Sequence, residues 1–114
     1  MSEKINYESY IQSKDWRKVR ERYFESNMPQ VCFACSLKKQ PGFHLHHKTY
    51  KRLGKERLTD LMLLCSDCHT KIHTIHRNKK IKIALWYVST KFVRESRKLN
   101  GLDTNIFKAE KPKR

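Results

Sequence analysis

The chain has 114 residues, of which 26 are lysine or arginine and 11 are aspartate or glutamate, so its formal net charge is +15. This length fits one compact domain, and a hydrophobic content of 38% allows only a modest core, which favours stabilisation by a metal ion. The charge favours a polyanion such as nucleic acid over a membrane, because the sequence has no long apolar run or basic amphipathic anchor.

The first predicted elements are two short helices within residues 6–26 that share one apolar face. Ser13 is placed to cap the second helix. The apolar positions are Tyr7, Tyr10, Ile11, Trp16, Val19, Tyr23 and Phe24. We interpret these side chains as core rather than as platforms for base stacking.

The middle and the end of the chain predict two strands and two longer helices. A strand is expected over residues 43–48 and a buried one over 61–64, separated by an exposed basic loop over 49–59. Ser66 is placed to cap a helix that runs to about residue 76. A helix over 79–99 should end at Asn100 and Gly101, followed by a basic tail over 102–114.

Four cysteines form two Cys-x-x-Cys pairs: Cys32 with Cys35, and Cys65 with Cys68. Two residues between thiolates let one turn place both sulfurs on one ion, and two such turns complete the tetrahedron that Zn²⁺ prefers. With all four positions taken by sulfur, this ion is expected to be structural. Free thiols or a redox pair are the alternative. Paired spacing of this kind indicates a reducing compartment, and the N-terminus lacks the apolar core of a secretory signal.

All six histidines lie between residues 44 and 76. His69 and His73 are four residues apart on the predicted helix, so both imidazoles lie on one face, as a transition-metal site requires. His46 and His47 are neighbours on a strand and point to opposite sides, so one can bind an ion while the other moves a proton. His44 and His76 are interpreted as solvated side chains.

These residues carry a family resemblance. The segment His46-His47-Lys48, the run from Asp60 to His69, and His73 resemble the HNH endonuclease motif in its cysteine-bearing form. Residues 7–16 resemble the helical lead-in of small phage and prophage members, so the resemblance covers about residues 7–76. It implies an α+β fold: a small zinc-stabilised ββα-metal (His-Me finger) domain with flanking helices, here spanning residues 1–114, with its zinc knuckle and core over residues 30–77.

The resemblance also implies roles for individual residues. His46 and His69 would be metal ligands, His73 would complete the site, and His47 would be the general base. The family has asparagine where this chain has Asp60. An aspartate accepts backbone hydrogen bonds but cannot donate the amide ones. Its added negative charge either raises the basicity of His47 or recruits a basic loop residue, and Asp60 is expected to be an orienting residue.

The expected activity is metal-dependent hydrolysis of DNA, with His47 taking a proton from the attacking water. One catalytic divalent ion is implied, Mn²⁺, Mg²⁺, Ni²⁺ or Zn²⁺, and imidazole ligands suit Mn²⁺ or Ni²⁺ at least as well as Mg²⁺. The expected partner is double-stranded DNA, which the protein is expected to bind with low sequence specificity. Basic loop residues should contact its phosphates: Lys48, Lys51, Arg52, Lys55 and Arg57.

Two other functions stay open. A non-catalytic zinc-ribbon module that binds DNA or RNA would keep the cysteines and the charge but give His47 no chemical task. A toxin-like nuclease would need a delivery domain. The phage resemblance points to packaging or recombination proteins as partners and to the cytoplasm of a bacterial or phage-infected cell. The sequence leaves open whether a monomer nicks one strand or a dimer cuts both.

Overall fold

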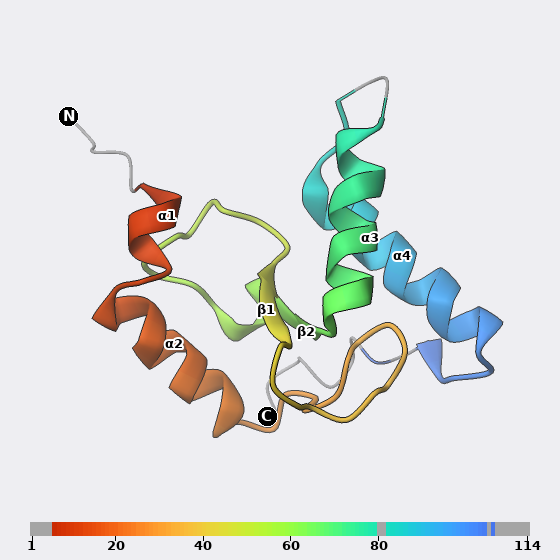
Figure 1. The fold of residues 1–114 in the computed structure, drawn as a ribbon, viewed down its shortest axis with the longest axis horizontal. Coiled ribbons are helices and arrows are strands. Elements are labelled where there is room, and N and C mark those ends of the chain that lie inside the picture. Colours follow the sequence, from red (N-terminus) through yellow and green to blue (C-terminus); the bar gives the residue numbers. More distant parts are fainter. Residues whose placement is uncertain (1–5, 80–81, 105, 107–114) are drawn as a thin grey trace, which may run out of the picture.

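The computed structural model describes residues 6–79, 82–104 and 106 (Figure 1). The elements follow one another as two helices, a strand, a short 3-10 turn, a second strand and two helices. Their bounds are α1 Tyr7–Tyr10, α2 Lys14–Phe24, β1 His44–His47, η1 Leu58–Asp60, β2 Leu61–Leu64, α3 Ser66–Arg77 and α4 Leu85–Leu99. This order of helices and strands is the one that the sequence predicts.

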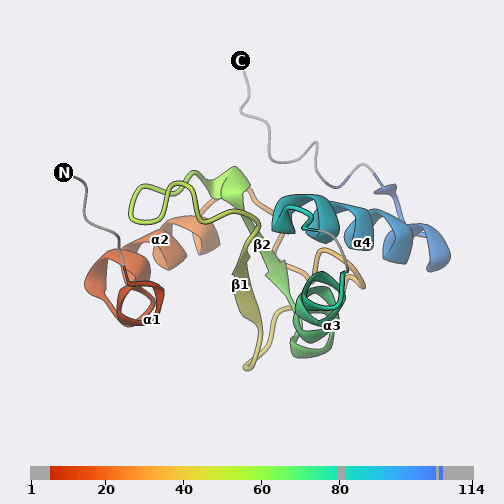
Figure 2. The ribbon, with the colours of Figure 1, turned by 90° about the horizontal axis from the view of Figure 1, so that it is seen from above.

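A two-stranded antiparallel sheet stands at the centre, with His46 opposite Met62 and His47 opposite Leu61. Helices α1 and α2 lie on one side of this hairpin, and α3 and α4 lie on the other, as both Figure 1 and Figure 2 show. All four residues of β2 are buried, which explains why this strand is a continuous apolar run rather than an alternating one.

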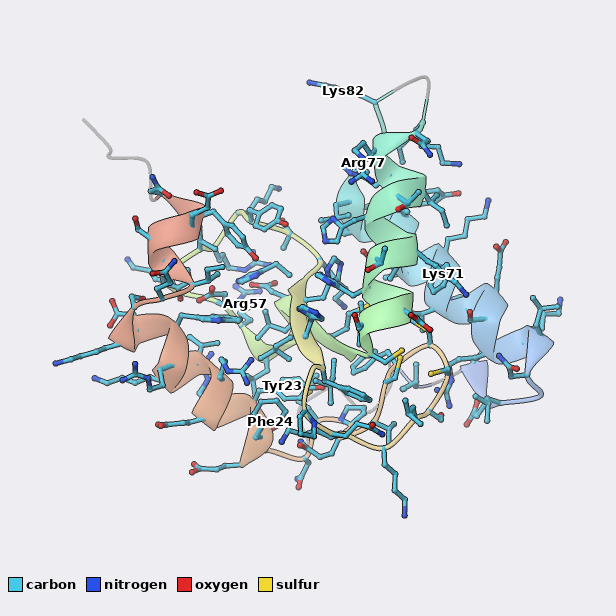
Figure 3. The ribbon with its side chains drawn as sticks, in the orientation of Figure 1. Tyr23, Phe24, Arg57, Lys71, Arg77 and Lys82 are labelled. Atoms are coloured by element: carbon cyan, nitrogen blue, oxygen red, sulfur yellow. The ribbon has the colours of Figure 1, made fainter. Side chains whose placement is uncertain are left out.

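The N-terminal helices form as the sequence predicts. Ser13 Oγ accepts a hydrogen bond from the backbone N–H of Trp16 at 3.2 Å, which caps α2. Trp16, Val19 and Tyr23 are buried on one face of α2, and this confirms their prediction as core. Figure 3 shows Tyr23 and Phe24 at the end of α2, beside the loop that follows it.

Helix α3 begins at Ser66, and its N-cap is Cys65 rather than the predicted Ser66. Cys65 follows directly on β2 and keeps an extended backbone, with φ −69° and ψ 165°, so the chain turns into the helix one residue earlier than expected. No side-chain hydrogen bond caps this helix. Its start is therefore placed by the strand and by the cysteine cluster rather than by a capping hydroxyl.

Helix α4 begins at Leu85, not at residue 79 as predicted. Asn78 is the C-cap of α3 and Ala84, in an extended conformation, is the N-cap of α4, so the two helices are separate elements. His76 Nε2 near the end of α3 lies 2.8 Å from the Ile83 carbonyl oxygen, just before α4. The predicted stop is confirmed, because Gly101 follows the C-cap with a φ of 69°. Most of the predicted basic tail lies outside the described residues.

A buried arginine attaches the end of α4 to the first cysteine turn. Arg97 Nη1 donates to the Phe33 carbonyl oxygen at 2.9 Å and lies 3.1 Å from Ser36 Oγ. Ser36 has a φ of 65°, the left-handed conformation of a tight turn. Within the described ranges, the helices are too short or too polar to cross a bilayer.

Candidate metal and catalytic centre

The four cysteines come together at the end of β2 and the start of α3. Their sulfurs all lie within 4.8 Å of one another, and Cys35 Sγ is 3.9 Å from Cys65 Sγ. Four sulfurs at about 2.3 Å from a tetrahedral Zn²⁺ would be roughly 3.8 Å apart, so the cluster fits this ion with little movement. Because all four cysteines are free rather than paired in disulfides, their thiols are available as ligands.

Hydrogen bonding among these thiols already favours deprotonation of one of them. A hydrogen bond from Cys68 lowers the pKa of Cys32 to about 4, against the opposing effect of burial. The same bond and burial raise the pKa of Cys68. The cluster therefore holds a thiolate next to protonated thiols, and a divalent cation would replace those protons.

Three of the predicted histidines form a second cluster. One ring nitrogen from each of His46, His69 and His73 lies within 4.8 Å of the others. The ring centroids are 5.2 Å apart for His46 and His69, 5.1 Å for His46 and His73, and 4.6 Å for His69 and His73. The two histidines of α3, spaced i and i+4, thus lie next to His46 of β1, as the spacing of the three residues predicts.

The electrostatics of this cluster keep its imidazoles neutral. Burial, followed by the neighbouring histidines, lowers the pKa of His46. Burial and His44 lower the pKa of His69 to about 4, and burial also lowers that of His73. Because a metal binds neutral imidazole, the three side chains are in the ligating form at neutral pH.

His46 has one ring nitrogen engaged and one without a partner. Its Nε2 lies 2.9 Å from Ser89 Oγ of α4, and both side chains are buried. Its Nδ1 is buried with no hydrogen-bond partner. A buried, unsatisfied nitrogen on a ring that lies beside two other imidazoles fits a metal ligand, because the ion would satisfy a lone pair that has no other partner.

His47 points to the other side of the hairpin, which confirms the predicted alternation. Its Nε2 lies 2.8 Å from Oε2 of Glu56, and neither side chain is more than 1% exposed. Since a carboxylate only accepts, Nε2 carries the proton and Nδ1 keeps the lone pair. Like the corresponding nitrogen of His46, Nδ1 of His47 is buried without a partner.

Two N-terminal elements hold this dyad in place. Trp16 stacks on the His47 ring at 4.7 Å with an angle of 29° between the planes. Tyr10 donates its hydroxyl hydrogen to Glu56 Oε1 at 2.7 Å, and Arg22 donates to the Glu56 carbonyl oxygen at 2.6 Å. The rings of Tyr7 and Tyr50 lie 5.8 Å and 5.6 Å from the His47 ring and form the outer wall of this enclosure.

Asp60 binds a basic residue of the loop, which is one of the two effects expected of its charge, rather than His47. Arg52 donates to its two carboxylate oxygens from Nε at 2.9 Å and from Nη2 at 2.5 Å, and the Arg57 backbone N–H donates at 3.0 Å. These bonds lower the pKa of Asp60 although burial acts to raise it. The carboxylate that contacts His47 is that of Glu56, which the sequence analysis missed. Its signal was present, because Glu56 is the one acidic residue of the loop over 48–59.

The predicted DNA-binding residues have different environments. Lys51, Lys55 and Arg57 are exposed, whereas Lys48 is buried and Arg52 is bound to Asp60. Figure 3 shows Arg57 on the side of the hairpin near α1 and α2, and Lys71, Arg77 and Lys82 along α3 and the segment after it. Cations therefore flank the histidines on both sides.

The two histidines interpreted as solvated are partly engaged. His44 is exposed but stacks on His69, with ring centroids 4.3 Å apart. His76 is half-buried and lies within hydrogen-bond distance of the Ile83 carbonyl oxygen. Neither belongs to the group of three nitrogens described above.

The four-cysteine cluster and the histidine-bearing hairpin and helix define a small zinc-binding ββα-metal domain with flanking helices. A scan against protein families matches residues 32–74 to the HNH endonuclease family, so this central segment of the chain is similar to that family. No curated protein and no solved structure matches it. The matched segment contains both clusters and His47, but Trp16 and Ser89, which contact the histidines, lie outside it.

Proposed function

We propose that the protein is a metal-dependent endonuclease that hydrolyses phosphodiester bonds of DNA, with His47 as the general base. One observation carries the proposal: the strand that brings His46 to His69 and His73 turns the next imidazole toward a buried carboxylate. A proposed metal ligand, His46, and the proposed base, His47, are thus consecutive residues of one strand, and each has a buried Nδ1 without a hydrogen-bond partner.

His46, His69 and His73 would hold the divalent ion, and Ser89 would fix which nitrogen of His46 faces it. When bound, this ion supplies a positive charge that offsets the negative charge growing on the phosphate and leaving oxygens. A site of three imidazoles suits Mn²⁺ or Ni²⁺ at least as well as Mg²⁺, since Mg²⁺ prefers oxygen ligands.

His47 would act through Nδ1. As the water oxygen forms its bond to phosphorus, Nδ1 takes the water proton, and the bond between phosphorus and the leaving oxygen breaks. Glu56 keeps Nε2 protonated beforehand and stabilises the imidazolium afterwards, because its carboxylate accepts the Nε2 hydrogen throughout. Water reaches Nδ1 only when a side chain of the aromatic wall moves, and Tyr7 and Tyr50 are the members of that wall with exposed surface.

DNA is the substrate that the charge favours. The exposed loop cations Lys51, Lys55 and Arg57 can bind phosphates beside the cut without contacting base edges, so cleavage of double-stranded DNA at many sequences is the expected behaviour. Arg52 contributes less to DNA binding than the sequence predicts, because Asp60 holds its guanidinium.

A plasmid-nicking assay with wild type and His47→Ala tests the proposal, in Mg²⁺, Mn²⁺, Ni²⁺, Co²⁺ and Zn²⁺ in turn. Loss of a general base should slow cleavage by about 10²- to 10⁴-fold while metal and DNA binding persist. His76→Asn is the matched control, since this histidine of α3 lies outside the cluster of three. If wild type is as inert as His47→Ala in every metal, yet binds DNA and holds zinc, the protein is instead a non-catalytic zinc module.

A further inference from the structure

A groove runs along α4 on the face that is turned away from the core. Its volume is about 580 Å³, and it is lined by Lys48 at the end of β1 and by residues of α4 that include Trp86, Tyr87, Lys91 and Arg94. Helix α4 lies beyond the segment that matches the HNH family, so that family match assigns the groove no role.

The groove exposes two aromatic side chains at the start of α4. Trp86 is 54% exposed and Tyr87 is 46% exposed, although the same helix buries Val88 and Val93 on its other face. Their ring centroids lie 6.1 Å apart with the planes nearly perpendicular. Val88 and Val93 thus pack α4 on the core, and the rings of Trp86 and Tyr87 form a separate apolar surface that is exposed to solvent.

The same groove is basic. Lys91 and Arg94 follow the two aromatic residues along the exposed face of α4. Lys48, which follows β1, also lines the groove, and Glu95 is the one carboxylate among the lining residues. A basic groove combined with exposed aromatic rings is a common means by which proteins hold single-stranded nucleic acid. The rings stack on bases, and the cations follow the phosphates.

The position of the groove relates it to the histidines. Lys48 directly follows His47 in β1, and Ser89 of α4 contacts His46 from the buried face of the helix that exposes Trp86 and Tyr87. Figure 2 shows α4 alongside the end of β1 from which the basic loop leaves. A strand lying in the groove would therefore contact Lys48, the residue that follows His47 in the chain.

We propose that this groove binds an unpaired stretch of a nucleic-acid strand, with bases stacked on Trp86 and Tyr87 and phosphates next to Lys91 and Arg94. Charge alone would serve a duplex equally well. A duplex, however, hides the faces of its bases, so exposed rings add affinity only where bases are unpaired. For cleavage, this rests on the proposed function: the substrate then has a single-stranded segment beside the cut, as in a fork, flap or gap.

The binding test uses the full chain with His47→Ala and no added divalent ion, so that nothing is cut. A dT oligonucleotide of about 12 nucleotides is compared with a blunt duplex of equal length. The oligonucleotide should bind more tightly. Because base stacking contributes about 1–3 kcal/mol, Trp86→Ala and Tyr87→Ala should each weaken its binding by roughly 5- to 150-fold while duplex binding changes little.

Controls separate stacking from folding and from charge. Trp86→Phe should retain most of the affinity for the oligonucleotide, because phenylalanine can still stack on a base. Trp86→Leu should lose it, although leucine is also apolar. Leu99→Ala, at the far end of α4 and 87% exposed, should bind as the parent does. Binding should also quench tryptophan emission, and Trp86→Phe should abolish this response because the remaining tryptophan, Trp16, is buried.

The groove assignment is overturned if duplex and single strand bind equally, or if Trp86→Ala and Tyr87→Ala leave oligonucleotide affinity unchanged. Nicking by wild type in that case would leave the proposed function standing. Conversely, quenching by the oligonucleotide in a protein that cuts nothing in any metal would support the groove and overturn the nuclease.

Discussion

Ser89 on α4 and His46 on β1 share a buried hydrogen bond of 2.9 Å, across 43 residues of sequence. If the hydroxyl accepts from Nε2, the lone pair of His46 is at Nδ1, the nitrogen that has no other partner. Residues of this kind orient a ligand without touching the ion. Ser89→Ala should therefore weaken binding of Mn²⁺ or Ni²⁺ about 10- to 100-fold, as measured by calorimetric titration.

Ser96→Ala provides the control for Ser89→Ala, since it removes a hydroxyl from the same helix away from His46. The zinc content of both variants should equal that of wild type, because the cysteines are untouched. Unchanged affinity of Ser89→Ala for the divalent ion would show that the hydroxyl does not position His46.

Glu56→Gln should impair the chemical step selectively. The amide can still accept one hydrogen bond, but it no longer stabilises the positive charge that His47 acquires. Hydrogen bonds to charged groups contribute about 1.5–3 kcal/mol, so kcat should fall roughly 10- to 100-fold with KM and metal affinity unchanged. Glu8→Gln, an exposed carboxylate of α1, should cleave normally. Equal kcat for Glu56→Gln and wild type would remove the carboxylate from the mechanism.

Asp60→Asn should loosen the loop that carries Glu56. The variant has the amide found in the family motif, but one oxygen cannot accept the three bonds that Arg52 and Arg57 donate. We expect the free energy of unfolding in urea to fall by about 1–3 kcal/mol. Glu21→Gln, which is exposed on α2, should leave it unchanged. A variant as stable as wild type would mean that these bonds do not hold the loop.

Acid should destabilise the histidine cluster. The folded-state pKa of His69 is lowered to about 4 from 6.5, so the unfolded chain takes up its proton first as the pH falls. The contribution of neutral His69 to stability is complete above pH 6.5 and is lost progressively down to about pH 4. In urea unfolding without added divalent ion, the decline over this range should be shallower for His69→Gln. Parallel declines would contradict the assigned cause.

The local features of the site could be predicted from the sequence. These features depend only on the spacing of residues within one element, which can be read from the sequence. They are the two Cys-x-x-Cys turns, the pair His69 and His73 one helical turn apart, and the alternation of His46 and His47. The apolar run over 61–64 likewise fixed β2, because four consecutive buried residues have no other place in so small a core.

What could not be predicted depends on contacts between distant segments. Glu56 lies at His47 because Tyr10 and Arg22, 46 and 34 residues earlier, hold it there. Ser89 reaches His46 only because α4 packs beside the hairpin. The start of α4 at Leu85 is likewise set by packing on the core, because its buried residues begin at Val88.

Cys68 and His69 are consecutive residues of α3, yet one belongs to the sulfur cluster and the other to the imidazole cluster. Two ions bound at these clusters would be joined through one peptide unit. Oxidising the thiols, or capturing their ion with a chelator, would free the first turn of the helix and tilt an imidazole away from its partners. The three-histidine site would thus lose its geometry although none of its histidines had been modified.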